Sequence, residues 1–175
     1  GNELGRVEEY VDRNRNKQFD PGEPFTDQSG NGKRDTDPLI EIQGLPKLTD
    51  LHLYDNRLNQ ISSMGDLPSM TTLLLSGNEI LEVGSLKQFH NLRQLSLANN
   101  RINTFDELDK LTTIERLNLA ENHICDLRPL RELKDLRSLD LRSNLVINLH
   151  DLSELKELEN LGLSYNLIHD PSPVL

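Results

Sequence analysis

Oxygen-bearing side chains alternate along residues 12–23 with a spacing that suits a calcium ion. Positions 1, 3, 5, 9 and 12 of this stretch are Asp12, Asn14, Asn16, Asp20 and Glu23. Position 7 is Gln18, whose backbone carbonyl would add a further ligand. Calcium takes six to eight oxygen ligands, and a chain that folds back around the ion presents them at alternating positions. The stretch is therefore predicted to be a calcium-binding loop.

A second stretch, which begins fifteen residues after the first, repeats this oxygen pattern. Its positions 1, 3, 5, 7 and 9 are Asp27, Ser29, Asn31, Lys33 and Asp35, with Lys33 contributing only its backbone carbonyl. Gly32 stands at position 6, where glycine permits the sharp turn of such a loop, whereas the first loop has Lys17 there. Position 12 is Pro38, so the bidentate carboxylate is missing unless Asp37 or Glu23 substitutes for it.

Both loops have the oxygen spacing of an EF-hand, but residues 24–26 alone separate them and leave no room for paired helices. The segment instead resembles the tandem calcium-binding repeats of secreted bacterial and extracellular proteins, related to dockerin and thrombospondin type 3 modules. The resemblance implies one or two bound Ca²⁺ ions and an acidic N-terminal cap over residues 1–38. The alternative is a flexible leader in which Asp, Asn, Gly and Pro gather without a metal.

Behind this segment the sequence repeats itself every 22 residues without a gap. Six repeats begin near residues 48, 70, 92, 114, 136 and 158, and each contains L-x-x-L-x-L with only Met70 and Ile114 replacing a leucine. The alternation around the last two leucines is typical of a short strand with one apolar face. Apolar residues three positions apart, such as Leu86 and Phe89, then suit a short helical or 3₁₀ turn.

An asparagine follows the last leucine of every repeat by three residues. These residues are Asn56, Asn78, Asn100, Asn122, Asn144 and Asn166. A side-chain amide both donates and accepts hydrogen bonds, so an inward-pointing asparagine at a bend can bind the backbone of its own coil and of the next one. The column therefore predicts an asparagine ladder.

The repeats resemble the 22-residue class of leucine-rich repeats, seen in internalin-type bacterial surface proteins and in a regulatory subunit of a eukaryotic protein phosphatase. The resemblance covers residues 39–175. It implies an α/β solenoid, a right-handed curved horseshoe with short parallel strands on its concave face and 3₁₀ or short helical turns on its convex face. It also implies a protein-binding module of a secreted or surface-exposed bacterial protein. The alternatives are a cytosolic scaffold or phosphatase-regulator-like adaptor without metal, and a spacer in a longer surface protein.

Composition narrows the function further. The formal net charge of −10 and the sequence pI near 4.9 argue against nucleic-acid binding and favour a basic partner. The sequence holds no apolar run of the roughly 18 to 20 residues that cross a bilayer, so we expect no membrane insertion. It also contains a single cysteine, Cys125, and none of the common catalytic motifs, so we do not expect an enzyme. We expect the chain to be a monomer.

The alternation that buries the leucines exposes the residues between them on the concave sheet. Aromatic and arginine side chains are frequent interface hot spots, which favours Tyr54, Arg142 and Tyr165 as partner-binding residues. His52, Leu74, Arg116 and Asp140 complete the predicted set, around a shallow middle of small residues. The alternative is an ordinary solvated sheet.

Overall fold

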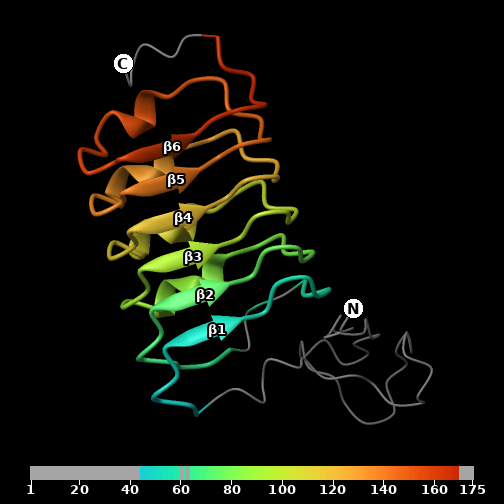
Figure 1. Cartoon of the computed structure of the whole chain (residues 1–175), viewed down its shortest axis with the longest axis vertical. Helices are drawn as coiled ribbons and strands as arrows, with labels where there is room; N and C mark the ends of the chain where they lie inside the picture. Colours follow the sequence, from blue (N-terminus) through green and yellow to red (C-terminus); the bar gives the residue numbers. More distant parts are fainter. Residues whose placement is uncertain (1–43, 60, 62–63, 170–175) are drawn as a thin grey trace, which may run out of the picture.

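The computed structural model describes residues 44–59, 61 and 64–169, which form a solenoid of stacked coils (Figure 1). The predicted cap of residues 1–38 lies outside the described residues. So do all of its predicted calcium ligands, from Asp12 to Glu23 in the first loop and from Asp27 to Asp35 in the second. Within the described part of the chain, no helix is long and apolar enough to cross a membrane.

Each coil contributes one three-residue strand to a parallel sheet. The strands are β1 (Asp50–His52), β2 (Thr72–Leu74), β3 (Gln94–Ser96), β4 (Arg116–Asn118), β5 (Ser138–Asp140) and β6 (Asn160–Gly162). They are hydrogen-bonded in chain order, and each strand residue lies beside the one 22 positions later, as Leu51 lies beside Leu73. The repeat length therefore sets the register of the sheet.

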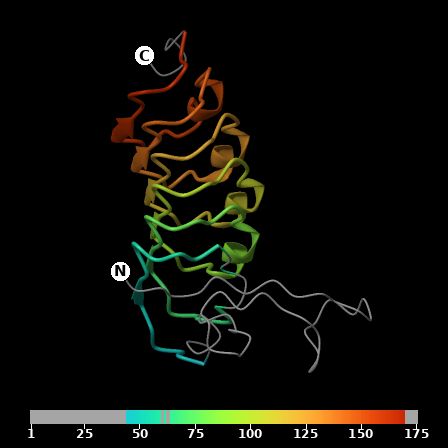
Figure 2. The same ribbon diagram turned by 90° about the vertical axis from the view of Figure 1, so that its right-hand side faces the viewer.

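Short 3₁₀ helices lie on the opposite side of the coils from the strands (Figure 2). They are η2 (Gly84–Gln88), η3 (Asp106–Lys110), η4 (Arg128–Glu132) and η5 (His150–Leu152). In η2 the Leu86 N–H donates to the Val83 carbonyl (2.9 Å), and the Leu86 side chain is buried. The fold class predicted from the sequence, a curved leucine-rich-repeat solenoid with parallel strands and 3₁₀ turns, is confirmed.

The core is a continuous stack of leucine, isoleucine, valine, methionine and phenylalanine side chains between the sheet and the 3₁₀ turns. The inward leucines of the middle strands, such as Leu95 and Leu117, are almost fully buried. Leu51 on β1 and Leu161 on β6 are only partly buried. These two belong to the first and last described strands, each of which has a described neighbour on one side only. A coil therefore completes its core only between two others.

The asparagine ladder is present and buried, with its four middle members exposed by only 4 to 7%. The Asn100 amide donates to the carbonyls of Leu75 (3.0 Å) and Leu97 (2.9 Å), and its oxygen accepts from the Ile80 N–H (3.0 Å). Each such asparagine thus binds its own coil and the preceding one. The sequence analysis expected the next coil instead, but the N–H that faces each amide oxygen belongs to the residue 20 positions earlier.

The residue before each ladder asparagine adopts the left-handed conformation. Its φ is +55° at Asp55, +70° at Gly77, +51° at Asn99, +56° at Glu121 and Ser143, and +59° at Tyr165. The backbone N–H of the left-handed residue points toward the next coil. The Asn99 N–H, for example, donates to the Ala120 carbonyl (2.9 Å). The conformation costs a residue other than glycine about 1 to 2 kcal/mol. The hydrogen bonds and core packing around each bend must therefore outweigh that strain.

The Asn100→Ala substitution should lower the free energy of unfolding by about 1 to 3 kcal/mol, because the buried Ile80 N–H would lose its acceptor. The two carbonyl partners keep hydrogen bonds from the neighbouring ladder asparagines. Asn103→Ala, at an exposed asparagine of the same coil, is the matched control and should change stability by less than about 0.5 kcal/mol. Equal urea midpoints for Asn100→Ala and the wild type would contradict the ladder.

Candidate functional site

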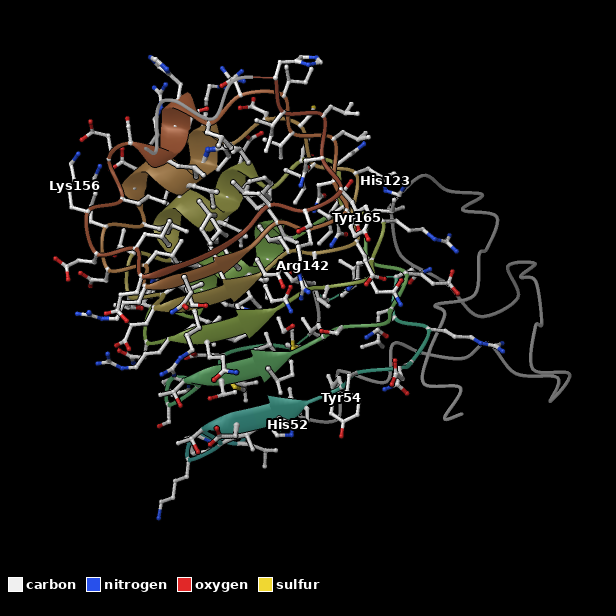
Figure 3. The ribbon with its side chains drawn as sticks, turned by 45° about the horizontal axis from the view of Figure 1, so that its top comes forward. His52, Tyr54, His123, Arg142, Lys156 and Tyr165 are labelled. Carbon is white, nitrogen blue, oxygen red and sulfur yellow. The ribbon has the colours of Figure 1, made fainter. Side chains whose placement is uncertain are left out.

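The outward side chains of the sheet form one continuous surface, which we call the strand face. Two columns on the strands make up its centre: Asp50, Thr72, Gln94, Arg116, Ser138 and Asn160, and then His52, Leu74, Ser96, Asn118, Asp140 and Gly162. In Figure 3, His52 and Tyr54 lie beside β1, while Arg142 and Tyr165 lie farther along the solenoid. The predicted partner-binding residues are thus spread along the whole face.

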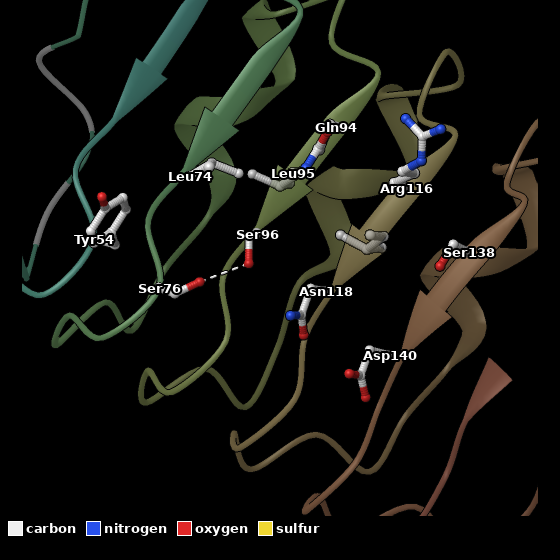
Figure 4. A pocket seen from close by; sticks show the side chains of 11 residues that line it. Tyr54, Leu74, Ser76, Gln94, Leu95, Ser96, Arg116, Asn118, Ser138 and Asp140 are labelled. Atoms are coloured by element: carbon white, nitrogen blue, oxygen red, sulfur yellow. Dashed lines mark hydrogen bonds between the residues drawn. The ribbon is translucent and has the colours of Figure 1, made fainter. Parts of the chain in front are cut away.

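A shallow depression of about 410 Å³ lies on the strand face between Tyr54 and β5 (Figure 4). Four of the predicted residues line it, namely Tyr54, Leu74, Arg116 and Asp140. Its remaining polar lining consists of Ser76, Gln94, Ser96, Asn118 and Ser138, and the hydroxyls of Ser76 and Ser96 are hydrogen-bonded (2.7 Å). The structure therefore gathers part of the predicted set, while His52, Arg142 and Tyr165 do not line the depression.

The apolar end of the depression is formed by Tyr54 and Leu74. The Tyr54 side chain is 55% exposed, and its ring centroid lies 6.3 Å from that of His52 with the planes tilted by 38°. Leu74 is half-buried on β2. An exposed aromatic ring held by a neighbouring ring is well suited to pack against an apolar side chain of a partner.

Arg142 is bound by Asp140 within its own coil. The Arg142 guanidinium donates to both carboxylate oxygens (Nε to Oδ1 2.9 Å, Nη2 to Oδ2 2.6 Å), and its backbone N–H donates to Oδ1 (3.1 Å). A Cβ on Gly162 of the next strand would lie 2.8 Å from Asp140 Oδ1, so the glycine leaves room for the pair. Burial alone would raise the pKa of Asp140, but the hydrogen bonds from Arg142 outweigh it and lower the pKa below its usual value. Arg142 therefore does not offer a free positive charge.

Arg116, in the centre of the face, is the contrasting case. It is exposed, and within the described residues its guanidinium makes neither an ion pair nor a hydrogen bond. Its cross-strand neighbours, Gln94 and Ser138, are uncharged. The sequence analysis favoured Arg142 and Tyr165 over Arg116 as partner-binding residues, because spacing alone does not show which arginine forms an ion pair with a carboxylate.

Tyr165 follows β6, and its side chain is 85% exposed. It also carries the left-handed φ of +59°, a conformation in which glycine would be relaxed. An aromatic residue is thus both strained and solvated at this bend. Its predicted role in binding stays a prediction.

Five polar residues that line the depression were not among the predicted binding residues. These are Ser76, Gln94, Ser96, Asn118 and Ser138. Their column positions placed them on the exposed side of the strands, but small and uncharged side chains carry no hot-spot signal. Elsewhere in the described chain, no three His, Cys, Asp or Glu side chains are grouped to hold a metal ion.

Comparisons with known proteins find leucine-rich repeats in part of the sequence. The family described as leucine-rich repeats in two copies matches residues 68–110, and a second leucine-rich-repeat family matches residues 42–80. No curated protein gives a significant match to the sequence. The two matches together span residues 42–110, and they agree with the leucine-rich-repeat solenoid of the fold.

Three solved structures share the fold. Internalin C2 of Listeria monocytogenes is 28% identical, with a TM-score of 0.65 over 79% of this chain and 70% of that one. A leucine-rich-repeat protein of Leptospira interrogans is 27% identical, with a TM-score of 0.61 over 77% of this chain and 42% of that one. The functional domain of Listeria monocytogenes InlJ, which includes a cysteine ladder, is 21% identical, with a TM-score of 0.60 over 67% of this chain and 25% of that one. The family matches and this internalin-like fold support a protein–protein interaction module.

Proposed function

We propose that the chain binds a protein partner on its strand face, across the depression between Tyr54 and Asp140. The proposal rests on the residues that line the depression, which combine an exposed tyrosine and a leucine with an unpaired arginine. Protein interfaces are rich in such aromatic and arginine anchors. The small side chains between them leave space for a partner's backbone to approach the sheet.

The opposite side of the solenoid offers a poorer surface for a partner. Ion pairs there join neighbouring coils: Lys87 with Glu107 (3.3 Å), Arg131 with Asp151 (2.5 Å) and Lys134 with Glu154 (3.9 Å). A partner on that side would have to displace or accommodate charges that are already paired. The polar groups of the depression have fewer such partners, which favours the strand face.

The strand face is also rigid enough to bind without much reordering. Every strand is hydrogen-bonded in register to its neighbours, and the inward leucines are packed in the core. A surface that is already ordered loses little conformational entropy when a partner docks. This supports binding by the whole face rather than by a single loop.

The Ser138→Tyr substitution should weaken binding of a protein partner, recovered by affinity capture and then purified, by about tenfold or more, because the ring would fill the depression. Thr104→Tyr, at an exposed position outside the depression, is the matched control and should bind like the wild type. Circular dichroism should show both variants folded. Retained binding by Ser138→Tyr together with lost binding by Arg131→Glu would place the interface on the opposite side.

We also propose that residues 12–23 and 27–38 bind one or two Ca²⁺ ions and that the protein works outside the cell or on its surface. The proposal rests on the alternating oxygen ligands of the two stretches. The millimolar calcium outside cells would keep even weak loops of this kind occupied. The likeness of the repeats to internalin C2 is consistent with this location.

Titration calorimetry on the full chain should detect calcium binding, and Asp12→Asn with Asp20→Asn should abolish binding at the first loop. At 100 times the dissociation constant, calcium should add about 2.7 kcal/mol to the free energy of unfolding. Asp135→Asn, an exposed aspartate in the repeats, is the control and should leave binding unchanged. Absence of heat at millimolar calcium, with no change in melting temperature on adding chelator, would contradict the proposal.

A further inference from the structure

We propose that Arg116 receives the carboxylate of one aspartate or glutamate side chain, carried by an extended segment of the partner that crosses the strand face. The inference rests on the proposed function and adds the chemistry of the contact. Arg116 lines the depression at the start of β4, one strand before Asp140 (Figure 4). A guanidinium at this place can bind a carboxylate through two parallel hydrogen bonds.

Arg116 differs from six other arginines of the described chain in lacking an acid. Each of these six contacts a carboxylate: Arg93, Arg101, Arg128, Arg131, Arg137 and Arg142. The two acids nearest to Arg116 by sequence and register are already engaged, since Glu115 contacts Arg93 and Asp140 binds Arg142. The described chain therefore leaves one uncompensated guanidinium in the middle of the face.

The groups around Arg116 can complete the coordination of an incoming carboxylate. Asn118 accepts a hydrogen bond from the Ala120 N–H (3.0 Å) through its oxygen, which leaves its amide N–H groups without a partner among the described residues. The Gln94 amide and the Ser138 hydroxyl, on the strands either side of Arg116, are likewise without hydrogen bonds to the described part of the chain. An ionised carboxylate has about four acceptor positions, so a carboxylate bound by Arg116 retains acceptor capacity for a neighbouring donor.

The shape of the depression fits an extended segment rather than a chain end. Its lining reaches from Tyr54, beside β1, to Asp140 on β5. Neighbouring strands lie about 4.8 Å apart, so four steps span about 19 Å, the length of about six extended residues. Arg116, on β4, would then meet one side chain of the segment while Tyr54 and Leu74 meet an apolar side chain farther along.

The charge of the whole chain limits the partner further. The formal net charge of −10 repels a strongly acidic partner at long range. A segment that carries a single carboxylate and is otherwise neutral or basic can bind Arg116 without strong repulsion from the net negative charge of the chain. This reconciles the basic partner expected from composition with an acidic contact at the centre of the face.

A synthetic array of seven-residue peptides with amidated C-termini tests the inference on the full-length chain. The central position is glutamate, glutamine or lysine, and the flanking positions are randomised. The wild type should bind the best glutamate peptides at least about tenfold more tightly than their glutamine counterparts, because a charge-assisted hydrogen bond is lost in the latter. Arg116→Gln should remove this difference, and Arg116→Glu should transfer the preference to lysine. Arg137→Gln, at an exposed arginine paired with Glu157 and Glu159, is the matched control and should keep it.

The outcomes separate this inference from the proposed function. Peptides that ignore the central charge, but are blocked by Ser138→Tyr, would overturn the Arg116 contact and leave the strand face as the binding surface. Binding unaffected by Ser138→Tyr would overturn both. The same peptides synthesised with a free C-terminal carboxylate form a second set, and binding by that set alone would replace the internal side chain with a chain end and overturn the extended segment. No binding by any peptide would overturn the inference.

Discussion

The backbone polar groups buried at the bend of every coil are the constraint on which the solenoid depends. A bend with a left-handed residue places N–H and carbonyl groups inside the protein, where water cannot reach them. The ladder asparagine satisfies three of them at once: its N–H groups reach two carbonyls and its oxygen accepts one N–H. Without the asparagine ladder, the leucines could still collapse into a core, but the buried polar groups of each bend would lack hydrogen-bond partners. The same bend would then not be stabilised in every repeat.

The ladder also determines how the proposed binding surface is arranged. Because each asparagine ties its coil to the preceding one, the strands stack in register and their inward leucines fill one core. The outward side chains do not pack in the core, so glutamine, arginine, serine and asparagine can occupy neighbouring strands. Arg116 illustrates the result: its position is fixed by the repeat, while its lack of an acid follows from the particular neighbours it has.

The sequence predicted the features that recur in every repeat, and it missed features that depend on individual pairs of side chains. Column positions placed the strands, the 3₁₀ turns and the asparagine ladder correctly, because 22-residue spacing and buried leucines leave one arrangement. The direction of the ladder was predicted wrongly, since spacing alone does not distinguish a preceding coil from a following one. The ion pair between Arg142 and Asp140 depends on side-chain rotamers and on the space left by Gly162. The 22-residue spacing predicts neither of these. The calcium stretches lie outside the described residues and stay a prediction.

Native-state hydrogen exchange tests the central claim most directly, because it reports each ladder N–H separately. The Ile80, Ile102 and Ile124 amides, which donate to the buried ladder oxygens, should exchange as slowly as strand amides although they lie in loops. The Val146 amide should exchange faster, since its acceptor Asn166 is only partly buried in the last described coil. Exchange of the three central amides at the rate of the exposed Asn103 amide would contradict the account.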